Sequence, residues 1–246
     1  MLEARGLSCR DAEDQLRLER VDLTLEAGEI LGIAGVQGNG QRELAEVLSG
    51  RRPFDAGVLQ LGGRRMAPGE RVPRAWRAGL IPEDRSTEGL IGGMTLWENL
   101  LLGRLDALPF LGGFWFAHAP ARRWALPLIE RFRVSPPNAE LPAVALSGGN
   151  QQKLLCAREL SREPRVLVAS QPTRGIDLGS SRFLHELLRA LRAGGSGIVL
   201  ISADLDEILA LSDRVAVLYR GRLHGPWPRS AVDLAGLGRA MVGVHR

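Results

Sequence analysis

Lysine is nearly absent from this sequence of 246 residues. Of its 32 basic residues, 31 are arginines and only Lys153 is a lysine, so any mechanism that needs a lysine elsewhere is excluded. No apolar run approaches the roughly 18 residues that a membrane-spanning helix needs. The N-terminus also lacks the basic-then-apolar pattern of a secretion signal. We therefore expect a soluble protein of the cytoplasm.

Cysteine and histidine are scarce as well. Cys9 and Cys156 have no metal-ligand spacing, and we expect two unreactive thiols rather than a disulfide. The four histidines lie far apart in the sequence and predict no metal cluster. The net charge is only +4, and the arginines occur in scattered pairs. This pattern favours a solvated surface over a nucleic-acid-binding stripe, so no nucleic-acid partner is expected.

The hydrophobic pattern alternates between strands and helices at both ends of the chain. Alternating apolar residues predict a strand over 18–25, and short apolar runs predict buried strands at 29–34, 166–169, 197–202 and 215–219. Apolar residues at helical spacing predict helices before Gly50, over 183–191 and over 205–211. Residues 95–160 are mostly helical in pattern, 53–78 show no clear element, and the tail after Gly225 has a weak pattern. The alternation predicts a mostly parallel α/β core with a helical subdomain inserted in the middle.

A glycine-rich loop, G-V-Q-G-N-G, runs from Gly35 to Gly40 between the strand at 29–34 and the helix that ends near Gly50. Backbone N–H groups at such a turn can cradle a phosphate, because the helix N-terminus carries partial positive charge. Tight strand-to-helix turns also use glycine for steric reasons alone. A dinucleotide-binding domain is a further alternative, since Asp55 lies near the acidic position which that motif requires.

A second motif is more specific. Leu146 to Lys153 reads L-S-G-G-N-Q-Q-K and resembles the signature of the nucleotide-binding domains of ABC transporters. The likeness continues in register through V-L-V-A-S-Q-P-T, R-G-I-D-L-G and V-L-I-S-A-D-L-D-E-I, and so covers almost the whole chain. The segment I-P-E-D-R (81–85) is similar to the subgroup that imports sugars and nucleosides. That subgroup fuses two such domains in one polypeptide, and the features here resemble the C-terminal one.

The resemblance implies a fold and a division of the chain. The fold is an α/β, P-loop ABC-type ATPase core, a mostly parallel sheet with an antiparallel β portion, and an inserted helical subdomain. Residues 1–246 would form a single nucleotide-binding domain. Within it, 1–90 and 160–225 would form the core, 91–159 the helical subdomain with the signature, and 226–246 a C-terminal tail.

The chain departs from the family pattern at the positions that carry catalysis. Gln41 stands where the family has the lysine of the phosphate loop, and Arg42 where it has the hydroxyl that binds Mg²⁺. Ser170 and Gln171 replace the metal-binding aspartate and the catalytic glutamate, and Ala203 replaces the switch histidine. Glutamine cannot act as a general base, a role worth roughly 10²–10⁴-fold in rate.

Two further departures concern phosphate and adenine. Glu83 stands where the family has a glutamine, and its charge would repel phosphate unless a metal or an arginine intervenes. No aromatic residue precedes Phe54, so the residue on which the family stacks adenine is missing. We therefore expect a degenerate loop that binds nucleotide weakly or not at all, and an isolated domain that is deficient in hydrolysis. The residues of this loop are Gly35, Gly38, Gly40, Gln41 and Arg42.

The intact signature implies a role in trans. In this family two domains dimerise head to tail, and each ATP lies between the phosphate loop of one and the signature of the other. A helix cap by Ser147 would explain that serine but not the residues after it. The candidates for contact with the partner's ATP are Ser147, Gly148, Gly149 and Gln151. Asp177 resembles the loop aspartate that communicates across the dimer, and Glu83 would lie beside a cleft that receives the permease.

The expected cofactors are ATP, shared with the partner domain, and Mg²⁺ held by the partner's site. The expected partners are a second nucleotide-binding domain, membrane permease subunits and, indirectly, a solute-binding protein. The chain would then lie in the cytoplasm, on the inner face of the cell membrane.

Three alternatives remain at this stage. A chromosome-maintenance or repair-type ABC ATPase carries a similar signature but should show long heptad segments or a basic groove, and neither is visible. A nonhydrolytic regulatory or scaffold ABC domain is allowed by the degenerate loop, although it leaves the signature without a ligand. A dinucleotide-binding domain does not explain the signature or the strand motifs.

Overall fold

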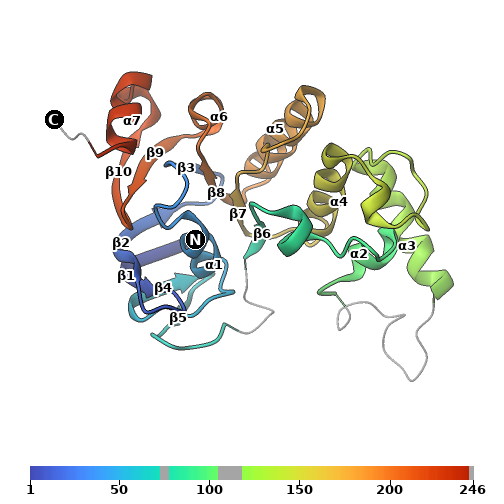
Figure 1. Ribbon diagram of the computed structural model, residues 1–246, viewed down its shortest axis with the longest axis horizontal. Helices are drawn as coiled ribbons and strands as arrows, with labels where there is room; N and C mark the ends of the chain where they lie inside the picture. The colour runs from blue at the N-terminus through green and yellow to red at the C-terminus, as the bar shows by residue number, and fades with distance from the viewer. Residues whose placement is uncertain (73–77, 105–117, 244–246) are drawn as a thin grey trace. The chain divides into compact units, whose positions relative to one another are not determined.

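The computed structural model describes residues 1–72, 78–104 and 118–243 (Figure 1). It divides into two compact units. Unit 1 comprises Met1–Pro82, Pro164–Pro172 and His185–Arg246, and unit 2 comprises Glu83–Glu163 and Thr173–Leu184. We describe each unit by itself.

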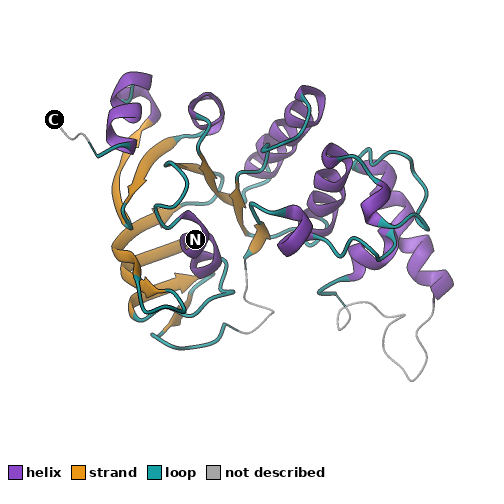
Figure 2. Cartoon of the chain, in the orientation of Figure 1, coloured by secondary structure: helices purple, strands orange, loops and turns teal. Residues whose placement is uncertain are grey.

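Unit 1 is built on two sheets, drawn in orange in Figure 2. One is antiparallel with the order β2-β1-β4-β5. Its strands are β1 (Leu2–Arg10), β2 (Leu16–Leu25), β4 (Ala56–Leu61) and β5 (Arg64–Met66). The other has the order β10-β9-β3-β8-β7-β6 and is parallel except for the β9–β10 pair. Its strands are β3 (Ile30–Ala34), β6 (Gly79–Ile81), β7 (Val166–Ser170), β8 (Gly197–Ser202), β9 (Arg214–Tyr219) and β10 (Arg222–Pro228).

The core of unit 1 explains the pattern of its strands. All residues of β3 and β8 are buried, as expected for central parallel strands that are covered on both faces. Helix α1 (Gln41–Leu48) packs against β7 and β2, and helix α6 (Leu205–Leu211) packs against β3 and β8. Alternate residues of the parallel strands join one core cluster with α1 and the antiparallel sheet, among them Leu31, Ile33, Val166, Val168, Val199 and Ile201.

Strand β2 contains a bulge. Leu7 pairs with Val21 and Cys9 pairs with Leu18, so β2 has one residue more than β1 over this stretch. Arg20 lies within the bulge with a φ of 48°. The extra residue keeps both Leu18 and Val21 fully buried, although they are three positions apart.

The C-terminal segment is more ordered than its weak pattern predicts. Strand β10 pairs with β9 through a turn at Arg220 and Gly221. Helix α7 (Leu234–Met241) then packs against β9 and buries Leu237 and Met241. Only one face of this short helix is buried, so few apolar residues mark its helical pattern. Its two glycines, Gly236 and Gly238, obscure that pattern further.

Unit 2 is helical, and within its described residues it contains no strand that belongs to either sheet. Its helices are α2 (Leu96–Leu101), α3 (His118–Arg131), α4 (Gly148–Leu160) and the first part of α5 (Leu178–Ala193). Thr95 and Glu98 form a capping box at the start of α2, which packs against α3 and α4. Residues 105–117, within the segment that is mostly helical in pattern, lie outside the described residues.

The predicted fold class is confirmed: a mostly parallel α/β core with an antiparallel β portion and a helical subdomain. Both cysteines are free, buried thiols, and burial raises the pKa of Cys156 to about 12. None of the described helices is long and apolar enough to span a bilayer.

Candidate functional site

The strand motifs of unit 1 meet at one edge of the parallel sheet. Ala34 of β3 pairs with Ser202 of β8, and Ser170 of β7 pairs with Ile201, so the three strands end nearly level. The glycine loop, Gln171 and Ala203 directly follow these ends. The carboxyl edge of a parallel sheet is where ligands bind in open α/β folds. The structure thus brings together the phosphate-loop, strand and switch positions that the sequence singled out.

Two glycines of the loop are required by backbone conformation and a third by space. Gly38 and Gly40 have φ values of 92° and 100°, a region that side chains with a Cβ rarely enter. A Cβ on Gly40 would also collide with the Arg17 carbonyl oxygen. A Cβ on Gly35 would lie 2.7 Å from the side-chain nitrogen of Gln41. The loop therefore closes tightly around Gln41.

The Gln41 side chain lies inside the glycine loop, and the residue is only 5% exposed. Its Nε2 donates a hydrogen bond to the Val36 carbonyl oxygen. Its Oε1 accepts one from the Asn39 backbone N–H at 3.0 Å. Both ends of the carboxamide are thus bonded to the backbone of the loop itself. Arg42, one residue on, is exposed and pairs with Glu46 at 3.1 Å.

Asn39 ties the loop to the β9–β10 turn. Its Oδ1 accepts a hydrogen bond from the Arg220 N–H at 2.8 Å, and its carbonyl oxygen accepts one from the Gly221 N–H at 3.0 Å. The Gly221 carbonyl oxygen in turn accepts from the Glu19 N–H of β2 at 2.9 Å. The loop is therefore held by internal protein contacts on two sides.

The end of β7 supplies a hydroxyl and an amide at the two positions where the family carries carboxylates. Ser170 is buried, and its Oγ has no hydrogen-bond partner among the described residues. Gln171 has a φ of 49°, and its Oε1 accepts a hydrogen bond from the Ala203 N–H at 3.3 Å. The side chain of Gln171 thus contacts the backbone of the residue at the switch position.

These residues do not fit a bound Mg²⁺–nucleotide in this loop. The Gln41 side chain occupies the interior of the loop and accepts a hydrogen bond from the Asn39 N–H. Gln41, Ser170 and Gln171 carry no charge that could hold a divalent ion. No cluster of metal-binding side chains occurs among the residues that the structure describes.

The signature lies in unit 2, at the start of α4. Ser147 occupies the N-cap position, yet within the described residues its hydroxyl makes no capping hydrogen bond to the α4 backbone. The hydroxyl instead accepts from the Asn150 side chain at 3.0 Å, and Ser147 is exposed. Helix capping therefore does not account for this serine.

The signature glycines are close to the neighbouring segments. A Cβ on Gly148 would lie 2.6 Å from Nη2 of Arg85, and one on Gly149 would lie 2.7 Å from Oδ2 of Asp177. The Asp177 carboxylate accepts hydrogen bonds from the Ser180 hydroxyl and backbone N–H, which lower the pKa of Asp177 below its usual range. At Gly149 the short side chains of Asp177 and Ser180 leave no room for a Cβ, whereas at Gly148 the clashing atom is the end of the flexible Arg85 side chain.

Gln151 and Glu83 are engaged within unit 2. Nε2 of Gln151 donates to the Ala143 carbonyl oxygen at 3.2 Å, so its side chain points back along the chain rather than outward. Glu83 forms an ion pair with Arg174. An arginine therefore lies beside Glu83 and offsets its negative charge.

Sequence reasoning missed three contributors to these sites: Asn39, Arg85 and Arg174. Each lies within a motif that was recognised, but its partner is remote in sequence. Arg220 is 181 positions from Asn39, and the carbonyl oxygen of Arg174 is 89 positions from Arg85. The motifs therefore indicated the segments in which these residues lie, but not the remote residues that they contact.

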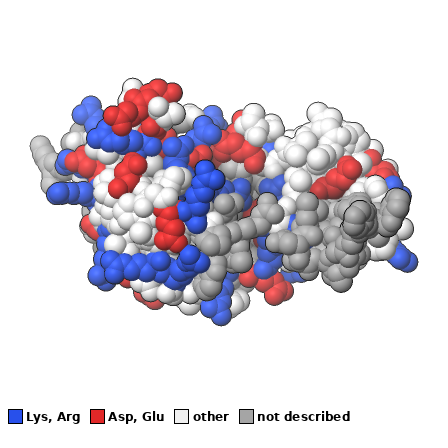
Figure 3. All heavy atoms as spheres, turned by 90° about the horizontal axis from the view of Figure 1, so that it is seen from below, with Lys and Arg blue, Asp and Glu red and all other residues white. Residues whose placement is uncertain are grey.

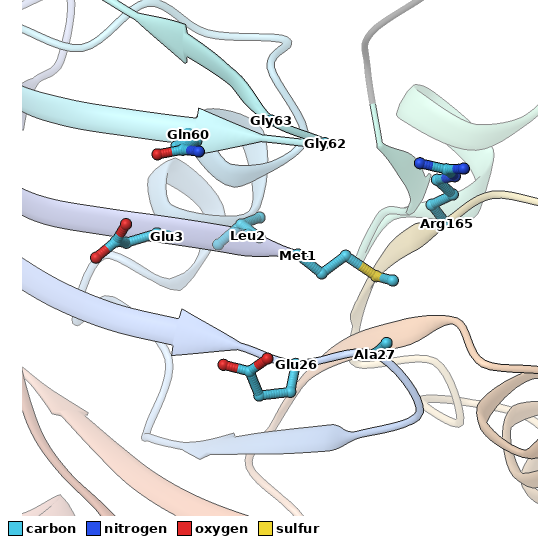
Figure 4. Close-up of a pocket in the computed structure, with 9 residues that line it drawn as sticks. All are labelled: Met1, Leu2, Glu3, Glu26, Ala27, Gln60, Gly62, Gly63 and Arg165. Atoms are coloured by element: carbon cyan, nitrogen blue, oxygen red, sulfur yellow. The ribbon is translucent and has the colours of Figure 1, made fainter.

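A separate hollow of about 430 Å³ lies in unit 1 (Figure 4). Its lining includes Met1, Glu3, Glu26, Gln60 and Arg165. Glu26 follows the last residue of β2, whereas the Arg17 carbonyl oxygen that approaches Gly40 belongs to the start of that strand. Ten residues of strand span about 30 Å at roughly 3.3 Å each. The hollow is therefore distinct from the glycine loop.

Many arginines are paired with carboxylates. On the face shown in Figure 3, basic and acidic side chains lie interspersed. Arg222 pairs with Glu19, and Arg52 pairs with Glu46. The surface on this face thus has the mixed character that the scattered arginine pairs predict.

A glycine loop between a central parallel strand and a helix, with polar positions at the same sheet edge, defines an α/β domain of the phosphate-loop class. The family model for ABC transporters matches residues 18–174. The chain belongs to the ABC transporter family.

Three curated proteins that resemble this chain in sequence are import ATP-binding proteins. The chain is 40% identical over 248 residues to a glucose import ATP-binding protein of Haloferax volcanii, covering 99% of this chain and 45% of the relative. It is 35% identical to a ribose import ATP-binding protein of Geobacillus kaustophilus, covering 95% and 49%. It is 38% identical to a guanosine import ATP-binding protein of Bacillus subtilis, covering 91% and 44%. The chain spans about half the length of the curated relatives it matches.

Solved structures agree on the fold. The dimeric ATP-binding cassette MJ0796, in a post-hydrolysis state bound to ADP and Pi, superposes with a TM-score of 0.77 at 20% identity. The superposition covers 93% of this chain and 99% of that one. A nucleotide-free ATP-binding cassette gives a TM-score of 0.75 at 22% identity, covering 93% and 91%. At these identities the likeness establishes the ATP-binding-cassette fold.

Proposed function

We propose that this chain is the C-terminal ATP-binding domain of an importer for sugars or nucleosides. In this role it donates its signature to the ATP site of a partner domain, and its own site does not hydrolyse ATP. The relatives are ATP-binding proteins for the import of glucose, ribose and guanosine, and they support the solute class. The share of each relative that the chain covers supports the presence of a second domain.

The main support for an inactive ATP site in this chain is the position of the Gln41 side chain. Its carboxamide bonds to the Val36 carbonyl oxygen and the Asn39 N–H from inside the loop. A lysine at this position would bring a charge to the phosphates, whereas glutamine brings none. At the ends of β7 and β8, Ser170, Gln171 and Ala203 offer neither a carboxylate nor an imidazole. These four positions therefore supply neither a charged metal ligand nor a base for hydrolysis.

The exposed hydroxyl of Ser147 supports the role in trans. It stands at the N-terminus of a 13-residue helix without capping the helix backbone within the described residues. The N-terminus of such a helix attracts anions, because the aligned backbone dipoles give it a partial positive charge. A γ-phosphate held by a partner domain is an anion of the required kind. Mg²⁺ and the catalytic base would come from the partner.

The remaining assignments follow from the family. An importer ATPase acts on membrane permease subunits, and a solute-binding protein delivers the solute to them. In this assignment the chain lies in the cytoplasm, against the inner face of the membrane. ATP-driven closure of the two nucleotide-binding domains shifts the permease between its states.

The test is phosphate release from Mg-ATP by the complete importer. In the variant Ser147→Arg, we expect turnover to fall by about 100-fold or more, because bulk and charge block the partner's ATP. Ser230→Arg introduces the same side chain at an exposed serine of unit 1 and should leave turnover unchanged. Full activity of Ser147→Arg would refute the role in trans.

Gln171→Ala tests the inactive site in the same assay. We expect turnover to stay within about twofold, because an amide at this position cannot act as a base. A loss comparable to that of a catalytic residue would show that this half of the transporter hydrolyses ATP.

The filled loop also suits a regulatory or scaffold ABC domain that needs no nucleotide. Such a domain predicts normal turnover in both Ser147→Arg and Gln171→Ala. The two functions are therefore separated by the Ser147 variant alone.

A further inference from the structure

The guanidinium of Arg85 touches two segments that are far from it in sequence. Arg85 begins a single helical turn, Arg85–Gly89, in unit 2. Its Nη1 donates a hydrogen bond to the Arg174 carbonyl oxygen at 3.0 Å, and its Nη2 donates to the Gly175 carbonyl oxygen at 3.4 Å. The same Nη2 lies only 2.6 Å from the point that a Cβ of Gly148 would occupy.

This position fits the shape of arginine. A guanidinium presents several N–H groups in a fixed plane, so it can donate to two carbonyl oxygens at once. A lysine ammonium is a single centre on a flexible stem and does not reproduce that fork. The absent side chain of Gly148 leaves room for the guanidinium against the start of α4. Arg85 thus connects the Arg174–Gly175 segment with the signature.

The placement of Arg85 is costly in two respects. Its Nε–H is buried without a hydrogen-bond partner among the described residues. Its positive charge also lies beside the N-terminus of α4, where the helix dipole disfavours cations. Two nearby acids direct their hydrogen bonds elsewhere: Asp84 accepts from the Ser86 and Thr87 N–H groups, and Glu83 pairs with Arg174. The charge of Asp84 still attracts that of Arg85. A buried donor left without a partner costs free energy, which the two hydrogen bonds to the Arg174 and Gly175 carbonyl oxygens offset.

We propose that Arg85 is a positioning residue for the signature. By bonding the carbonyl oxygens of Arg174 and Gly175 while packing on Gly148, it fixes the start of α4 against the segment that leads to Asp177. Ser147 is then held ready for the partner's ATP. This inference rests on the proposed use of the signature in trans.

The expected kinetic effect falls on turnover and not on ATP affinity. ATP first enters the partner's loop, which the change does not touch, so KM should stay within about twofold. The signature engages when the domains close, which precedes hydrolysis. We expect Arg85→Gln to lower kcat about tenfold, which corresponds to about 1.4 kcal/mol in activation free energy.

Two further variants of the complete importer make the test specific. Arg85→Lys keeps the charge and the aliphatic stem but loses the fork, and we expect the same loss of kcat. Arg162→Gln is the matched control. Arg162 also has a buried Nε, and its Nη2 donates a hydrogen bond to the Leu102 carbonyl oxygen. Arg162 lies just after the C-terminal end of α4, away from the signature. The control variant should lower the melting temperature at least as much as Arg85→Gln while leaving kcat nearly unchanged.

The outcomes separate this inference from the proposed function. If Arg85→Gln keeps full kcat, or if Arg85→Lys restores it, the two-carbonyl bridge has no positioning role and the inference is wrong. If Ser147→Arg also keeps full activity, the proposed function has failed with it. If Arg85→Gln lowers the melting temperature more than Arg162→Gln does, Arg85→Lys decides the question.

Discussion

Gln41→Ala removes the side chain that fills the glycine loop. Two hydrogen bonds disappear, one to the Val36 carbonyl oxygen and one from the Asn39 N–H. The Val36 carbonyl oxygen keeps a bond from the Asn39 side chain at 3.0 Å, so the Asn39 N–H is the group left without its partner. The change therefore weakens the loop and opens its interior.

The cost follows from these contacts. Each of the two lost hydrogen bonds contributes about 0.5–1.5 kcal/mol, which sums to about 1–3 kcal/mol. We expect the free energy of unfolding to fall by about 1–3 kcal/mol. For a chain of this length, each kcal/mol lowers Tm by roughly 2–4 °C, so Tm should drop by about 2–12 °C. Gln60→Ala, at a half-buried glutamine of β4, should change the stability by less than about 0.5 kcal/mol.

The assay is thermal unfolding of this chain with and without ADP. The opened loop of Gln41→Ala offers backbone amides to a phosphate, so ADP should raise its Tm. A ligand at 100 times its Kd stabilises a protein by about 2.7 kcal/mol, enough to be seen in such a scan. The wild-type chain should show no shift, because Gln41 already occupies the loop.

Two results would refute this reasoning. If ADP stabilises the wild-type chain as much as the variant, Gln41 does not exclude nucleotide. If Gln41→Ala unfolds at the wild-type temperature, the carboxamide does not hold the loop. The role of the signature in trans would survive either result, since it depends on unit 2.

Two further predictions concern pH and thiol chemistry. Hydrogen bonds from the Thr95 side chain and backbone lower the pKa of Glu98 below its ordinary value of 4.5. The contribution of Glu98 to stability is therefore complete above that value and is lost as the pH falls through the lowered pKa. Thermal unfolding from pH 6 to pH 2.5 should therefore show a smaller acid-induced loss for Glu98→Gln than for the wild type, and equal losses would contradict the capping box. Because burial raises the pKa of Cys156 to about 12 and also raises that of Cys9, a thiol reagent at pH 8 should label neither until the chain unfolds. Rapid labelling of the folded protein would show that one of these sites opens to solvent.

Local motifs predicted most of the candidate site. The glycine loop, the ends of β7 and β8, and the signature are each contiguous, so their residue types are visible in the sequence. The parallel sheet then brings the glycine loop and the ends of β7 and β8 to one edge. Whether Gln41 would point into the loop or out of it could not be predicted, because that depends on the amides and carbonyls of the folded loop.

The antiparallel sheet was harder to predict than the parallel one. Strand β1 escaped notice because its alternation breaks at Gly6, where φ is 58° and the register with β2 shifts. Strands β4 and β5 are short and surrounded by glycines and arginines. Buried parallel strands are apolar throughout and need no alternation, so they are easier to recognise.

The contacts that join remote segments were beyond sequence reasoning. Nothing near Arg85 indicates that its partners are the carbonyl oxygens of Arg174 and Gly175. Backbone carbonyls are present at every residue and leave no mark on the sequence. Such contacts follow only from the path of the folded chain.

The tie between Asn39 and the β9–β10 turn bears on how the protein is made. The two segments are 181 residues apart, so a ribosome completes the glycine loop long before it synthesises Arg220. Contacts at such separation close large loops and form late in folding. A nascent chain would therefore carry an unanchored glycine loop until the final hairpin emerges and bonds to it.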